Sequence, residues 1–285
     1  MEQRLIRVLT ALTCDPWLLP PQIHVKLTEI ATNHARGGDF EERQHAVAAA
    51  MPMNGKKRAY QMAGNTAVIP VEGIIGRKFS DALYSSGVTS IDVLDRMLAE
   101  AATDDQIGSV LLVFDSPGGL AMGVPEVGQR IRQVGESKPV LAYADGLMGS
   151  AAYWLASQAN AIYAMPSADV GSIGVYIAVL DQSRRAEMAG LEVNLFKSGK
   201  HKGMGYPGTR LSDEQKAMLQ ERVDTLAAQF KAAVREGRGK PIDDDCMQGQ
   251  SFDAATAMKN GLVDSVCDLE TALRDVGRLA DMRKR

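Results

Sequence analysis

The sequence has few cysteines and few histidines, and this restricts the chemistry that it can carry. Its 285 residues include 3 cysteines and 4 histidines. Cys14, Cys246 and Cys267 lie far apart, form no Cys-X-X-Cys pair and show no metal-ligand spacing. We therefore expect a reducing, intracellular setting and no metal site.

The sequence also lacks an excess of basic charge and a long apolar run. The formal net charge is -3 and the isoelectric point about 5.9, whereas nucleic-acid-binding proteins usually carry a basic face. The first 17 residues lack the apolar stretch of a signal peptide. Residues 146–168 carry no formal charge, but Gln158 and Pro166 interrupt the roughly 20 apolar residues that a spanning helix needs. We expect no nucleic-acid partner, no membrane segment and a cytoplasmic location.

Two regions differ in their pattern. Residues 1–62 predict a polar helical arm and linker, because their apolar residues have helical spacing and no strand pattern appears. Residues 63–285 predict an α/β domain with a mostly parallel sheet and flanking helices, because β-branched runs alternate with amphipathic stretches. The expected strands lie at 66–75, 107–119, 139–146, shortly after residue 160 and near the end of 184–199. The expected helices lie at 90–105, 123–136, from Ser150 onward, at the start of 184–199 and at 212–236.

The 212–236 helix has the strongest helical pattern. Ser212 and Gln215 have the spacing of a capping box at its start. One apolar stripe runs along it, which is typical of core or of a subunit interface. The stripe consists of Met218, Leu219, Val223, Leu226 and Phe230.

Ser150 stands alone between Gly149 and Ala151 at the start of an apolar helix. Serine is a preferred helix N-cap, because its oxygen accepts a hydrogen bond from a free backbone N–H group. The same position would also suit a nucleophile held at a helix start. The local sequence alone leaves both interpretations open.

Two glycine-containing stretches end predicted strands. Asp115–Gly119 reads DSPGG, which indicates either a tight β-turn or a place where backbone N–H groups approach a ligand closely. The stretch GLMGS before Ala151 follows the next strand, so both stretches lie at the same edge of a parallel sheet. A serine beside a glycine-lined anion site is the geometry of acyl transfer, in which N–H groups stabilise the developing oxyanion.

A nucleophilic serine needs a base, and the sequence offers several. A lysine can serve when burial without a counter-charge favours its neutral form. Spacing alone does not select among the candidates, and the basic loop 197–202 is equally typical of a solvated turn. The candidates are His24, His34 and His45 in the arm and Lys197, Lys200, His201 and Lys202 in the α/β region.

Six pieces of residues 66–268 resemble, in order, the motifs of the signal peptide peptidase A family of serine peptidases. They are VIPVEGII, DSPGG, GSAAYWLAS, ADVGSIGV, FKSGKHKG and FDAATAMKNGLVDSV. The resemblance implies the fold shared with Clp protease and the crotonases, with an N-terminal helical arm added here. It implies peptide hydrolysis without a metal or cofactor.

The resemblance also implies roles for individual residues. Ser150 would be the nucleophile and Lys202 the general base, with Lys200 as the fallback. Ser172 would orient the lysine amine by a hydrogen bond. Family members form rings, so a neighbouring subunit would be able to complete the site.

The remaining site residues surround the two glycine stretches. The resemblance assigns the oxyanion hole to the backbone N–H groups of Gly119 and Ala151. Leu120, Met122 and Met148 flank these stretches, so we expect them to contact substrate and to favour small or apolar residues there.

The arm sequence LTALTCDPWLLPPQIHVKLTEI is similar to the front end of the phage prohead protease branch, which includes the capsid-maturation protease of lambda-like phages. The expected function is therefore a serine endopeptidase that cleaves capsid protein, scaffold protein or itself, in the host cytoplasm or the prohead. Two departures from the family are the lack of a membrane anchor and the sequence GMGYPG after the lysine motif. The alternatives are a bacterial peptidase that degrades signal peptides or misfolded peptides, and a non-cleaving, ring-forming capsid assembly protein.

Overall fold

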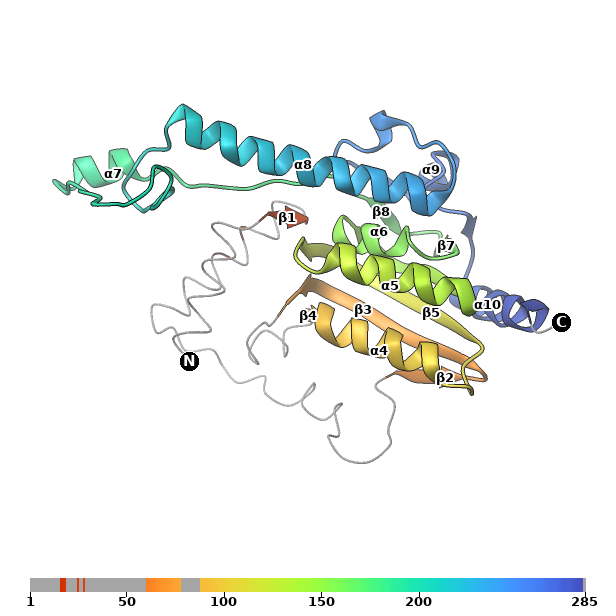
Figure 1. Cartoon of the computed structure of the whole chain (residues 1–285). Coiled ribbons are helices and arrows are strands. Elements are labelled where there is room, and N and C mark those ends of the chain that lie inside the picture. Colours follow the sequence, from red (N-terminus) through yellow and green to blue (C-terminus); the bar gives the residue numbers. More distant parts are fainter. Residues whose placement is uncertain (1–15, 19–24, 26–27, 29–59, 78–87, 284–285) are drawn as a thin grey trace, which may run out of the picture.

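A computed structural model describes residues 16–18, 25, 28, 60–77 and 88–283 (Figure 1). Within this part, ten strands form one sheet whose main path is β10-β7-β6-β5-β3-β2. The strands are β1 (Trp17–Leu18), β2 (Gln61–Ala63), β3 (Thr66–Gly76), β4 (Val88–Ser90), β5 (Ser109–Leu120), β6 (Val140–Gly149), β7 (Ala161–Ala164), β8 (Asp169–Gly171), β9 (Ser251–Asp253) and β10 (Ser265–Val266). The helices are α4 (Ile91–Thr103), α5 (Val124–Ser137), α6 (Ala151–Ala156), α7 (Ser183–Met188), α8 (Asp213–Arg238), α9 (Ala254–Lys259) and α10 (Leu269–Arg283).

The centre of the sheet is parallel, as the sequence predicts. β3, β5, β6 and β7 lie side by side in parallel register, and β2 adds an antiparallel edge. The central strands are nearly continuous apolar runs, because helices cover both of their faces. The predicted α/β class is confirmed.

Helices cover the two faces of the sheet in different numbers. α4, α5 and α6 lie on one face, and α10 lies on the other (Figure 1). The larger core includes Leu94 and Leu98 of α4, whereas Ala272 and Val276 of α10 pack with Tyr143 of β6 in a separate cluster. α10 therefore covers the amino-terminal halves of β5 and β6, where Leu111, Leu141 and Tyr143 lie.

α8 packs onto the domain through its carboxyl-terminal part. Trp154 of α6 and Phe230 of α8 stack with ring centroids 4.7 Å apart, and Phe230 and Val234 are the buried residues of this helix. The predicted capping box at Ser212 and Gln215 is present. The rest of α8 extends past α6 toward α7 (Figure 1), so most of its apolar stripe is only half-buried.

The strand predicted near the end of 184–199 is wrong, although the preceding helix is confirmed as α7. Residues 191–197 form no strand. No strand of the described residues pairs with them, and Phe196 is 97% exposed. Their apolar residues therefore mark a surface and not a core strand.

Neither glycine-containing stretch forms a tight turn, which was one of the two interpretations of DSPGG. β5 continues as an extended strand to Leu120, and β6 continues to Gly149. The β5–β6 register shifts between Phe114 and Ser116, and Ser116 Oγ donates a hydrogen bond to the Gly73 carbonyl at 2.5 Å. This irregularity lets the strand pass the Pro-Gly-Gly sequence without reversing.

Most of the arm predicted as helical lies outside the described residues, as do its three histidines. The described part departs from the prediction at Trp17–Leu18, which form β1. The predicted boundary after residue 62 falls inside β2. The division into arm and domain stays a prediction.

Asp264 connects the carboxyl-terminal strands to α8. Its side chain pairs with Arg238 and accepts a hydrogen bond from the Ile162 N–H group at 2.8 Å. Burial alone would raise the pKa of Asp264, but these hydrogen bonds and the charge of Arg238 hold it below its usual value. The stabilisation is therefore present at neutral pH and is lost as pH falls through this lowered pKa.

We expect Asp264→Asn to lower the free energy of unfolding by about 3 kcal/mol at pH 7, because the Arg238 side chain is only 3% exposed and loses its partner. Urea denaturation at pH 7 and at pH 3 measures the effect, which is expected to shrink at the lower pH. Asp275→Asn is the control, since its ion pairs with Arg274 and Arg278 are longer and more exposed and contribute less than about 1 kcal/mol. Equal effects of the two variants would contradict the assignment.

Candidate active site

Ser150 lies at the junction of β6 and α6, with its side chain 1% exposed in the described structure. It occupies the N-cap position of α6, but its side chain makes no capping hydrogen bond. Its Oγ instead lies 3.5 Å from the Gly174 carbonyl oxygen, the outer limit for a hydrogen bond. The capping interpretation therefore does not explain this serine.

The backbone of Ser150 has an uncommon conformation. Its φ is 53° and its ψ is -112°, a combination that costs a non-glycine residue energy and that occurs mostly where function requires it. Among the described residues, Ser150 and Ser172 are the two non-glycine residues with positive φ. The two serines singled out from the sequence are thus the two strained positions.

β8 brings Ser172 beside Ser150. The β6–β8 register pairs Gly149 with Gly171, so each serine follows the same register position on adjacent parallel strands. The Ser150 N–H group donates to the Gly171 carbonyl at 2.8 Å. A backbone bond therefore fixes the nucleophile candidate relative to the strand that carries Ser172.

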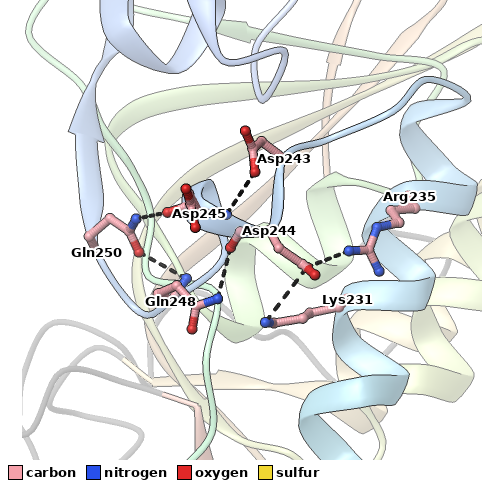
Figure 2. A network of polar contacts seen from close by, with 7 residues as sticks. All are labelled: Lys231, Arg235, Asp243, Asp244, Asp245, Gln248 and Gln250. Carbon is pink, nitrogen blue, oxygen red and sulfur yellow. Dashed lines mark hydrogen bonds and ion pairs between the residues drawn. The ribbon is translucent and has the colours of Figure 1, made fainter.

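A polar network between α8 and residues 243–250 (Figure 2) is linked to Ser172 through the backbone of Gln250. The Ser172 N–H group donates to the Gln250 carbonyl at 2.7 Å. The Gln250 side chain accepts from the Gln248 N–H group and donates to the Asp245 carbonyl. Arg235 of α8 binds the neighbouring Asp244. The network thus anchors the loop that holds Ser172 to α8.

Gly118 and Gly119 are packed too closely against other backbone segments to carry a side chain. A Cβ atom added at Gly118 would lie 2.0 Å from the Leu18 carbonyl oxygen and 2.9 Å from the Ala151 nitrogen. A Cβ at Gly119 would lie 1.7 Å from the Ile75 carbonyl oxygen of β3. The structure therefore brings Gly118 of the DSPGG stretch next to the first residue of α6, and the oxyanion-hole role of the Gly119 N–H group stays a prediction.

A groove of about 580 Å³ lies between the end of β5, at Leu120, and α8. Leu120 and Met122, both predicted to contact substrate, line it, and so does Pro16 of the arm. Leu226 and Met218 of α8 contribute apolar side chains to the opposite wall. Met148 is fully buried in the core and is not among the lining residues, so its contact with substrate stays a prediction.

The structure does not bring Lys202 to Ser150 within one chain. The loop 189–212 lies at the amino-terminal end of α8 (Figure 1), where Lys200 pairs with Glu214. Glu214 and Phe230 are separated by roughly 24 Å along the helix, since each residue adds about 1.5 Å. Within the described residues, the exposed Lys202 side chain has no ion pair or hydrogen bond. His201 lies in the same loop, and its Nδ1 is buried without a hydrogen-bond partner.

One component of this site, the short strand β1, was not predicted from the sequence. Tyr176 forms a bridge to Trp17 of β1, and burial raises the pKa of Tyr176 to about 12. The apolar DPWLLPP sequence was assigned to a helical arm. The proline on each side of Trp-Leu-Leu was the available signal for an extended segment.

Two further observations concern the described part of the chain. No group of three or more His, Cys, Asp or Glu side chains in it is arranged to hold a metal ion. None of its helices is both long enough and apolar enough to cross a membrane.

The site thus places a buried, strained serine at a strand–helix junction of an α/β fold, with the backbone of Gly118 packed against the next residue, Ala151. The family model of peptidase family S49 matches residues 132–283, a range that includes Ser150, Ser172 and Lys202. The chain belongs to peptidase family S49. Its mostly parallel sheet agrees with the expected Clp protease/crotonase-like fold.

Similar proteins come from phages and from bacteria. The chain is 30% identical to capsid assembly protease C of Escherichia phage lambda, over 80% of this chain and 52% of that protein. It is 29% identical to head-tail preconnector protein GP5 of Enterobacteria phage P21, over 76% of this chain and 43% of that protein. It is 28% identical to a putative signal peptide peptidase SppA of Enterococcus faecium, over 72% of this chain and 60% of that protein. The chain thus spans about half the length of the two phage relatives.

Proposed function

We propose that this protein is a serine endopeptidase in which Ser150 is the nucleophile and Lys202 of a neighbouring subunit is the general base. The observation that carries the proposal is the geometry of Ser150. It is buried and strained and has no capping bond, and its two neighbours Gly149 and Ala151 pack against Gly118. Such strain is a cost that a mere helix cap does not need.

The proposed mechanism is acyl transfer to Ser150. Its Oγ attacks the substrate carbonyl carbon while the lysine amine takes the Oγ proton. The N–H groups of Gly119 and Ala151 stabilise the oxyanion. The lysine then gives the proton to the leaving amine, and water hydrolyses the ester by the reverse proton path. Ser172 orients the lysine amine.

The distance between Lys202 and Ser150 in one chain supports an oligomer, because a ring would bring the loop 189–212 of one subunit to the site of the next. Exposed apolar residues on this side of the molecule support the same assignment. Leu180 is 77% exposed, Met188 80% and Phe196 97%. A contact between subunits would remove this surface from water.

The proposed substrates are capsid or scaffold proteins during phage head maturation. The names of the lambda and P21 relatives support this choice. The relative named as a signal peptide peptidase supports the bacterial alternative, the degradation of signal peptides. Both roles use the same peptidase chemistry.

An unfolded model protein tests the peptidase proposal. Full-length protein is incubated with reduced, carboxymethylated α-lactalbumin, and fragments are identified by mass spectrometry. We expect internal cleavage by the wild type and none by Ser150→Ala, whose folding is checked by circular dichroism. Fragments from both proteins would point to a contaminant, and fragments from neither would favour the non-cleaving assembly protein.

A further inference from the structure

β1 lies in the site as an added strand. Trp17 and Leu18 pair antiparallel with Leu120 and Gly119 of β5. On its other side, Trp17 exchanges two backbone hydrogen bonds with Tyr176, at 2.9 Å and 3.2 Å. The short segment is therefore held through its backbone from both sides, which is how a sheet edge binds an extended peptide.

The register of β1 places one particular carbonyl at the proposed oxyanion hole. Leu18 lies opposite Gly119. The point where a Gly118 Cβ would lie is bordered by both the Leu18 carbonyl oxygen and the Ala151 nitrogen. The Leu18 carbonyl oxygen thus lies beside the N–H group of Ala151, which is one of the two groups assigned to the oxyanion hole.

The side chains of β1 are fully enclosed. Trp17 is 2% exposed and Leu18 0% exposed, and Leu18 belongs to the main core cluster. The preceding Pro16 lines the groove beside Leu120, and its carbonyl accepts a hydrogen bond from the Ala121 N–H group at 3.4 Å. The groove therefore receives the residues on the amino-terminal side of Leu18.

We propose that Pro16–Leu18 binds as a substrate strand in the chain's own site and that the bond between Leu18 and Leu19 is a self-cleavage site. This inference rests on the proposed function, since it uses Ser150 as nucleophile. It assigns an apolar residue, here leucine, to the position before the cleaved bond. Occupation by β1 excludes other peptides until the bond is cut.

The cleavage step follows the proposed acyl transfer. Ser150 Oγ forms an ester bond with the Leu18 carbonyl carbon, and the bond to the Leu19 nitrogen breaks. The proton from Oγ passes through the lysine to that nitrogen, which becomes a new amino terminus. Water hydrolyses the ester and releases residues 1–18 with a free carboxylate.

Intact mass and amino-terminal sequencing of the full-length chain test the inference, with digestion of carboxymethylated α-lactalbumin as an independent measure of activity. We expect the wild type to lose residues 1–18 and to show the new terminus Leu-Pro-Pro, and Ser150→Ala to stay whole. Leu18→Arg is expected to keep this bond intact while it still digests α-lactalbumin, because arginine does not fit the enclosed leucine position and the segment then no longer occupies the site. Leu12→Arg, another leucine of the arm, is the matched control and is expected to be cut after Leu18.

The outcomes separate the two proposals. The wild type could digest α-lactalbumin and yet stay intact, or be cut only elsewhere in residues 1–62. Either result would overturn the self-cleavage site and leave the peptidase proposal standing. Failure to digest either substrate would overturn both. The comparison of wild type with Ser150→Ala decides even where Leu18→Arg does not fold.

Discussion

Replacing Lys202 by alanine is expected to lower peptidase activity about 10³-fold or more, whereas replacing Lys200 leaves it within about twofold. The two lysines lie two residues apart in one loop, so the pair is closely matched. Lys200 is engaged by Glu214 on its own chain. Lys202 makes no such contact within the described residues and is available to a neighbouring site.

The measurement is the initial rate of α-lactalbumin digestion at pH 8, with His201→Ala as a third variant. We expect His201→Ala to retain activity, because a lysine supplies the base. Loss of activity in Lys200→Ala alone would move the assignment to the fallback residue. Loss in His201→Ala, with an active Lys202→Ala, would replace the lysine by a histidine.

Mixing two inactive variants is expected to restore about a quarter of the wild-type activity. In a randomly mixed ring, a working site needs its serine from a Lys202→Ala chain and its lysine from a neighbouring Ser150→Ala chain. With equal amounts of the two variants, each condition holds at about half of the sites, because both variants present the same interface and mix at random. A site assembled within one chain would gain nothing from mixing.

Co-expression of the two variants with different affinity tags, followed by purification on both tags, supplies the mixed oligomers. Separately purified variants, mixed without subunit exchange, are the control and are expected to stay inactive. A mixed oligomer without activity would show that one chain supplies both groups after a rearrangement of the loop 189–212. Light scattering on the same samples reports whether an oligomer is present.

The sheet and its helices could be predicted because their signals are local. The continuous apolar run of β5 and the 3.6-residue periodicity of α4 each determine an element without reference to the rest of the chain. Ser150 could be singled out because a polar residue between two small ones interrupts an apolar stretch. Its partner Ser172 required the family resemblance.

The remaining features depend on contacts distant in sequence. β1 exists because Trp17 meets Tyr176, 159 positions away, and two residues contain no periodicity to detect. The strand expected near the end of 184–199 failed for the opposite reason: its pattern suits a strand, but the described part of the fold gives it no neighbouring strand. A turn was one interpretation of DSPGG because Pro-Gly is often part of a turn, whereas pairing with β1, β3 and β6 keeps the stretch extended.

The outward reach of α8 has a consequence for when such an enzyme would act. A subunit that offers its lysine only to a neighbour is harmless as a single chain, however many copies a cell makes. The rate of proteolysis then rises more steeply than the concentration of subunits, because only assembled subunits have a complete site. Crowding of the subunits in a confined space would start proteolysis, and dilution would stop it, without any separate inhibitor.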